Sequence, residues 1–282
     1  MEKTSRPLEV HTSVVNHPEF IEWQFRALKT FMKGDWNFVV FNDAKSWPEF
    51  TNFGDASMRA EIRRTCERLN VMCIDIPNDR HQSVTCPATR CADSMNFMVN
   101  SYRHVYNCGI HNRVLCIDSD MFPVVPMDAS TLYADVAAAY VPQPRENLNY
   151  IWNGLWYMDF DKVWSVDKID WCNGIFKNEL CDVGGAMTYW LDEKPTNAQV
   201  YEIKHRWSLT WDEKCALPHD MAPVWMDFFR KDVKNQGGKF WCELYDERFM
   251  HYRAGGNWEH LDRSVHDERI RGLREVFEKV LI

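Results

Sequence analysis

The stretch that decides the fold is Arg113-Val114-Leu115-Cys116-Ile117-Asp118-Ser119-Asp120, in which an apolar run ends abruptly in two carboxylates. An apolar run of this length is typical of a strand that is buried on both faces of a parallel sheet. In open α/β sheets, ligands bind beyond the carboxyl ends of the strands. Asp118 and Asp120 therefore predict a site of hard oxygen ligands, suited to Mg²⁺ or Mn²⁺ with phosphate oxygens completing the shell. The alternative is a solvated turn, since Asp is common in turns.

Strand and helix patterns alternate around this stretch. Apolar runs and turn residues predict strands at 9–15, 37–41, 71–76, 135–141, 155–159 and 247–252. Helical spacing of apolar residues appears between the first strands, and the C-terminal residues form an amphipathic helix pattern. The β-α-β-α-β-α-β order of the first half predicts an α/β fold with a mainly parallel, doubly wound sheet.

Composition excludes several other classes. The 282 residues are 45% hydrophobic, which suits one large globular domain. The net charge of −8, without a Lys/Arg run, argues against nucleic-acid binding. The charged start MEKTSRPLEV does not read as a signal peptide, and no run approaches the ~18 apolar residues of a membrane span. The ten cysteines form no CxxC pair, which favours free thiols in a reducing compartment, and hence the cytoplasm, over a zinc site.

The carboxylate pair after a buried strand resembles the DxD motif of GT-A glycosyltransferases, which transfer a sugar from a nucleotide-sugar. The resemblance implies that Asp118 and Asp120 hold Mn²⁺ (or Mg²⁺) on the donor diphosphate. Downstream, HYRAGGNW at 251–258 is similar to the H-x-x-G-x-x-K-P-W signature of the glycogenin-type family 8 enzymes. That similarity implies that His251 is the third metal ligand. The alternative is a strand-end histidine with a local hydrogen bond.

The same downstream segment carries further implications for the donor phosphates. The Lys-Pro step of the signature is absent, so Arg253 is our candidate for the cation that meets the diphosphate. Gly255 and Gly256 would let the backbone approach phosphate closely.

The resemblance also implies contacts with the nucleotide-sugar elsewhere in the chain. WNGLWYMDF at 152–160 is similar to the F-N-x-G segment of family 8, with one spacer residue missing, and the 90–96 segment resembles the A-x-N region of family 2 and related enzymes. The donor-binding residues implied are Asn16, Asp43, Arg90, Asn96, Asn153 and Gly154. Structural alternatives are a polar strand end at Asp43, exposed helix positions for Arg90 and Asn96, and an Asn-Gly turn at 153–154.

Asp182 lies in CDVGG at 181–185, just before an expected helix. GT-A enzymes place an acidic residue near this point. In inverting members it is the general base for the acceptor hydroxyl, and in retaining members it orients the acceptor or steadies the sugar. The resemblance implies one of these catalytic roles for Asp182. A carboxylate here would also cap a helix, which is the structural alternative. The Trp-rich stretch 150–171 and residues 207–229 are expected to shape an acceptor groove.

The resulting hypothesis is a single GT-A domain with a nucleotide-binding half at about 1–125, an acceptor and metal-completing half at about 126–260 and a C-terminal helix at 261–282. It would be a metal-dependent glycosyltransferase that moves a hexose or pentose from a UDP- or GDP-sugar to a hydroxyl, such as that of a glycan. Alternatives are a non-catalytic GT-A-fold sugar-binding protein and a sugar nucleotidyltransferase, although residues 8–20 lack the glycines of a nucleotidyltransferase phosphate loop. A haloacid-dehalogenase-type phosphatase is disfavoured, because Phe122 stands where its motif has Thr or Val.

Overall fold

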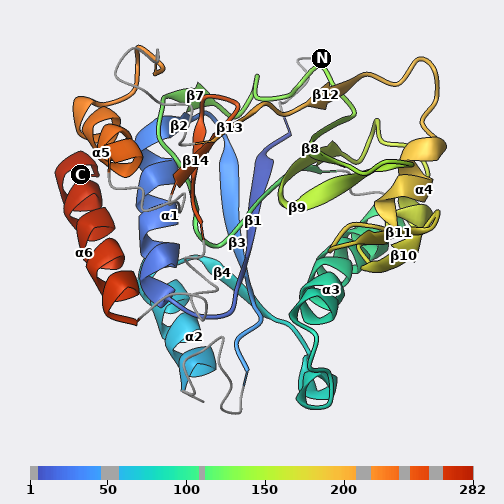
Figure 1. Cartoon of the computed structure of the whole chain (residues 1–282), viewed down its shortest axis with the longest axis horizontal. Helices are drawn as coiled ribbons and strands as arrows, with labels where there is room; N and C mark the ends of the chain where they lie inside the picture. Colours follow the sequence, from blue (N-terminus) through green and yellow to red (C-terminus); the bar gives the residue numbers. More distant parts are fainter. Residues whose placement is uncertain are drawn as a thin grey trace.

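A computed structural model describes residues 6–45, 57–107, 112–207, 217–234, 242–253 and 263–281. Its centre is a seven-stranded sheet in the order β12-β8-β9-β5-β1-β3-β4 (Figure 1). In that order the strands are Val200–Glu202, Ala138–Pro144, Asn149–Asp159, Arg113–Ile117, Leu8–Val14, Trp36–Asn42 and Met72–Asp75. Strands β5, β1, β3 and β4 are mutually parallel, as the first half of the sequence predicted. Strand β9 runs antiparallel to both β5 and β8, so the whole sheet is mixed.

Helices pack on both faces of this sheet because successive strand residues point to opposite sides. Helices α1 (Pro18–Phe31) and α2 (Met58–Leu69) pack on the face that carries Val40 of β3. Helices α3 (Pro87–Asn107) and α4 (Met187–Asp192) pack on the face that carries Phe41. Both faces of β3 are therefore buried, which explains its apolar run without alternation.

A second sheet and two helices form a further layer outside α1. The sheet has the order β13-β14-β15-β6, with bounds His205–Trp207, Cys242–Tyr245, Phe249–Tyr252 and Met121–Pro123. Helices α5 (Pro223–Lys234) and α6 (Arg263–Val280) lie beside it (Figure 1). Helix α1 is apolar on two sides, and Trp23 on its outer side stacks on Phe277 of α6 at 5.0 Å between ring centroids.

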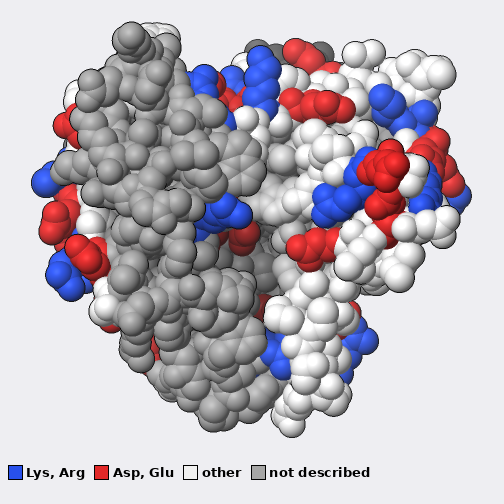
Figure 2. Space-filling view, in the orientation of Figure 1, with Lys and Arg blue, Asp and Glu red and all other residues white. Residues whose placement is uncertain are grey.

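Short elements complete the architecture. They are β2 (Met32–Lys33) with β7 (Met127–Asp128), β10 (Gly174–Phe176) with β11 (Glu179–Cys181), and 3-10 turns at Asp79–Gln82 and Val166–Lys168. The cysteines in the described part of the chain are all free thiols. None of the described helices combines the length and apolar character that crossing a membrane requires. In Figure 2, acidic and basic side chains are interspersed on the described part of the visible face.

Candidate metal site

The two aspartates lie in a tight turn where the two sheets meet. Strand β5 ends before Asp118, and β6 begins directly after Asp120. The Asp118 N–H donates to the carbonyl of Gly154 in β9 at 2.7 Å. From the other side, the buried amide of Gln24 in α1 donates to the carbonyls of Asp118 and Met121 at 2.7 and 3.0 Å. The turn is therefore fixed by the sheet and by α1, which sets the direction of both carboxylates.

His251 reaches the turn because β15 pairs with β6. The two strands run antiparallel with His251 opposite Met121, and the Tyr252 N–H donates to the Asp120 carbonyl at 2.8 Å. His251 Nε2 then lies 3.1 Å from Asp120 Oδ1. One ligand atom each from Asp118, Asp120 and His251 lies within 4.8 Å of the others. The structure thus brings together the three side chains that the sequence singled out as metal ligands.

The geometry and charge of this group fit a divalent cation. Two neighbouring ligands of an octahedral Mg²⁺ or Mn²⁺ are about 3.0 Å apart, close to the spacing of His251 Nε2 and Asp120 Oδ1. Burial and the neighbouring Asp120 raise the pKa of Asp118 to about 6. Burial opposes the charged form of His251, but the carboxylates of Asp120 and Glu243 raise its pKa well above the usual value. A bound cation would relieve the repulsion between the two aspartates.

A cavity of about 780 Å³ opens beside this group. It lies beyond the carboxyl ends of β1, β3 and β5, the position where open α/β sheets bind ligands. Besides the three ligands, its lining includes these residues with a predicted role: Asn16, Asp43, Arg90, Asn153, Asp182 and Arg253.

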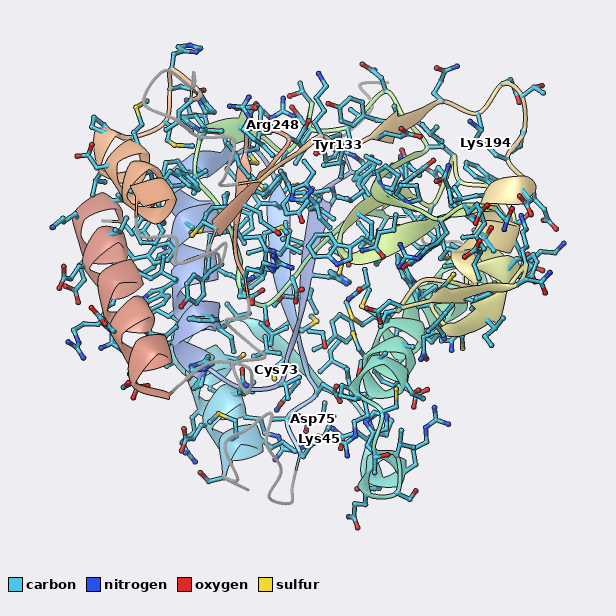
Figure 3. The ribbon with its side chains drawn as sticks, viewed as in Figure 1. Lys45, Cys73, Asp75, Tyr133, Lys194 and Arg248 are labelled. Atoms are coloured by element: carbon cyan, nitrogen blue, oxygen red, sulfur yellow. The ribbon has the colours of Figure 1, made fainter. Side chains whose placement is uncertain are left out.

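Asp43 lines the cavity but is held by internal partners. Its Oδ1 accepts from Lys45 Nζ and from Asn78 Nδ2, both at 2.9 Å, and its Oδ2 accepts from Ser94 Oγ at 2.6 Å. Lys45 is itself buried, and its Nζ lies 3.2 Å from His81 Nδ1. Figure 3 shows Lys45 near Asp75, at the carboxyl end of the strands. A role for Asp43 in recognising a nucleobase stays a prediction.

The two arginines predicted to meet the donor are placed differently. Arg90 in α3 donates to the carbonyls of Val84 and His81 at 2.6 and 2.9 Å, so it also holds the loop before α3. Arg253 follows β15, and 46% of its side chain is exposed. Its Nε lies 3.5 Å from Glu243 Oε1. Arg253 therefore presents a positive charge at the cavity beside the metal ligands.

Asn96 lies in α3 and is not among the described residues that line the cavity. Its amide donates to Asp170 Oδ1 at 2.9 Å, and its oxygen accepts the Trp171 N–H at 2.9 Å. These bonds tie α3 to the 170–171 segment, a structural role that differs from the predicted donor contact. Gly255 and Gly256 lie outside the described residues.

The Asn153-Gly154 pair lies within β9 and not in a turn. Asn153 Nδ2 lies 3.4 Å from Cys91 Sγ at the cavity wall. Gly154 faces the ring of Trp152, and a Cβ there would come within 2.3 Å of that ring. A Cβ at position 154 would therefore force the Trp152 ring to move from its place against the strand. The Gly154 carbonyl accepts the Asp118 N–H and so holds the turn.

Asp182 is exposed at the cavity and accepts the Val183 N–H at 2.8 Å. Helix α4 begins only at Met187, and its N-cap residue is Ala186. The alternative that Asp182 caps this helix is therefore wrong, because a further turn separates them. Its role as a general base stays a prediction.

Most of the tryptophans in these two stretches whose side chains are described lie in the core or pack against it, instead of shaping an acceptor groove. Trp156 and Trp171 stack at 5.3 Å beneath the sheet, and Trp225 of α5 is fully buried against α6. Trp152 does line the cavity. Residues 208–216 lie outside the described part of the chain.

Two residues near the site, Gln24 and Glu243, were not predicted from the sequence. Gln24 interrupts the apolar side of α1, and a polar residue at such a position is a usable signal of a buried hydrogen bond. Glu243 lies opposite His251 across the β14–β15 hairpin. Its signal was the short spacing between CELY and FMHY, which is typical of two strands joined by a tight turn.

No protein-family model matches the chain, and no curated protein matches it. The crystal structure of the galactosyltransferase LgtC in complex with donor and acceptor sugar analogues is similar to part of it. The match has 12% sequence identity, covers 57% of this chain and 62% of that chain, and has a TM-score of 0.35. This chain thus spans less than two thirds of that chain's length. A likeness of this extent identifies neither a family nor an activity for this chain.

Proposed function

We propose that this protein is a metal-dependent glycosyltransferase of the GT-A type, which moves a sugar from a nucleotide-diphosphate sugar to a hydroxyl acceptor. The observation that carries the proposal is the convergence of Asp118, Asp120 and His251 at one edge of a cavity beyond the strand ends. Two carboxylates and an imidazole form a donor set suited to Mn²⁺ or Mg²⁺. A cation bound there would act as a Lewis acid on the leaving diphosphate.

Other cavity residues have roles that follow from their chemistry. Arg253 would donate charge-assisted hydrogen bonds to the diphosphate oxygens. Asn153 would donate to, or accept from, sugar hydroxyls at the cavity wall. Asp182 is the exposed carboxylate of the lining, and it would take the proton of the acceptor hydroxyl as that oxygen attacks the anomeric carbon.

The test is release of nucleoside diphosphate from a panel of UDP- and GDP-sugars by the full chain. We expect release with at least one donor in the presence of Mn²⁺ and none after treatment with EDTA. His251→Ala should abolish release, and His219→Ala, at an exposed histidine that does not line the cavity, should not.

The competing functions give different outcomes in the same assay. Binding of a nucleotide-sugar without any release would favour a non-catalytic sugar-binding protein. Release of pyrophosphate from a nucleoside triphosphate and a sugar phosphate would favour a nucleotidyltransferase. Full activity of His251→Ala would refute the metal assignment.

A further inference from the structure

Glu243 is a buried carboxylate that adjoins the metal site without belonging to its three ligands. It is 3% exposed and lies in β14 between Cys242 and Leu244, both of which are also buried. An ionised carboxylate loses several kcal/mol of hydration on burial unless protein groups replace the water. The groups that surround Glu243 therefore indicate why it is there.

These groups include the candidate metal ligand itself. Strands β14 and β15 pair antiparallel, with Glu243 directly opposite His251. His251 Nδ1 lies 2.8 Å from Glu243 Oε2, and the Tyr245 hydroxyl donates to the same oxygen at 2.9 Å. The other oxygen, Oε1, lies 3.5 Å from Arg253 Nε and 3.8 Å from His205 Nε2.

The contact with Glu243 decides which ring nitrogen of His251 faces the aspartates. An ionised carboxylate can only accept a hydrogen bond, so Nδ1 carries a hydrogen. When a cation displaces the second hydrogen of the ring, the lone pair of the neutral imidazole is therefore on Nε2. Nε2 is the atom that lies 3.1 Å from Asp120 Oδ1. The ring also contacts Trp152, at 5.3 Å between centroids, so its tilt is restricted as well.

We propose that Glu243 is a positioning residue for the metal site, which holds His251 in the tautomer and orientation that present Nε2 to the cation. This inference rests on the metal site of the proposed function. A carboxylate that accepts from a ligating histidine also makes that ligand more basic, and loss of such a partner weakens metal binding about 10- to 100-fold. Through Oε1, the same carboxylate keeps Arg253 beside the site.

The competing explanation is that Glu243 only stabilises the hairpin. Asp246 offers a matched comparison, because it is also a buried carboxylate of this hairpin. It accepts hydrogen bonds from the hydroxyls of Tyr133 and Tyr201 at 2.9 and 2.6 Å. In Figure 3, Tyr133 and Arg248 lie at the end of the molecule opposite Lys45. These hydroxyl partners differ from the groups that surround Glu243, so neutralising Asp246 should weaken the hairpin without changing the tautomer of His251.

The experiment measures the Mn²⁺ Kd of the full chain by electron paramagnetic resonance titration, together with the Tm, for wild type, Glu243→Gln and Asp246→Asn. We expect Glu243→Gln to raise the Kd about 10-fold or more. Asp246→Asn should lower the Tm and leave the Kd unchanged. An unchanged Kd in Glu243→Gln, or an equal rise in both variants, would overturn the inference.

A second measurement does not depend on the folding of any variant. In Mg²⁺-loaded wild type labelled with ¹⁵N-histidine, His251 should carry its hydrogen on Nδ1, and a hydrogen on Nε2 would overturn the inference. Failure of the proposed function is distinguishable: wild type that binds no Mn²⁺ refutes the metal site and this inference together. Wild type that binds Mn²⁺ but transfers no sugar refutes only the transferase.

Discussion

The two strands that flank β1 both lead into carboxylates, yet the surroundings of those carboxylates are opposite. Asp43, after β3, is surrounded by donors of its own chain, including the buried ammonium of Lys45. Asp118 and Asp120, after β5, lie against each other, and burial together with Asp120 raises the pKa of Asp118 to about 6. The charge of Asp43 is compensated by the ammonium of Lys45. The two aspartates after β5 instead share the single imidazole of His251, and the three side chains together form a candidate cation site. The role of a carboxylate at a strand end therefore depends on the charged groups beside it, and its position alone does not define that role.

The sharpest test of this contrast is Asp120→Asn. We expect a loss of transfer activity of about 1,000-fold, because Lewis-acid stabilisation of the leaving group is worth several kcal/mol. The free energy of unfolding should change little, since the substitution relieves repulsion with Asp118 while it weakens the contact with His251. Steady-state kinetics and urea unfolding measure the two effects. A large loss of unfolding free energy in Asp120→Asn would show that this carboxylate stabilises the fold as Asp43 is expected to, and would contradict the contrast.

Asp43→Asn should show the reverse pattern. Removing one partner of a buried ion pair leaves the Lys45 ammonium uncompensated, which costs about 3 kcal/mol of unfolding free energy. Urea unfolding measures this loss, and the Mn²⁺ affinity of the folded variant should match wild type. If the unfolding free energy of the variant equals that of wild type, the ion pair between Asp43 and Lys45 does not stabilise this region.

Asp182 supplies a third, exposed carboxylate for the comparison. Asp182→Asn should slow transfer to the acceptor about 100-fold, as expected for loss of a general base, without a change in Tm. The Mn²⁺ Kd should also be unchanged. An Asn variant with full transfer activity would show that this carboxylate has no part in the chemistry.

The smallest expected effect is that of Gly154→Ala, which tests the support beneath the Asp118 turn. The new Cβ would meet the Trp152 ring at 2.3 Å, so overpacking should cost about 1–3 kcal/mol. The matched control is Gly272→Ala in α6, where nothing lies within 4 Å of the added Cβ and helix propensity improves. Equal stability of the two variants in thermal unfolding would contradict the proposed support.

The regular part of this fold could be predicted because its signals are local. The apolar run before Asp118 reflects a strand that is buried on both faces. The apolar spacing in α1 reflects a helix side that is buried over successive turns. The antiparallel course of β9 and the short strands β6, β13 and β14 could not be predicted, since they depend on pairing between distant segments. The same holds for the site. His251 was found through a family-like motif, whereas Gln24 and Glu243 act through contacts that only the folded chain reveals.

The pairing of β6 with β15 also affects when the site can form during synthesis and whether it can open in the folded protein. Strand β6 follows the aspartates directly, but its partner residue His251 lies 251 − 121 = 130 positions beyond Met121. The imidazole can therefore arrive only after that whole intervening segment has been synthesised. A fluctuation that detached this hairpin would remove one ligand while leaving the central sheet intact. Slow amide exchange in β1 alongside faster exchange in β15 would reveal such an opening, and with it a route by which a bound ion could enter and leave.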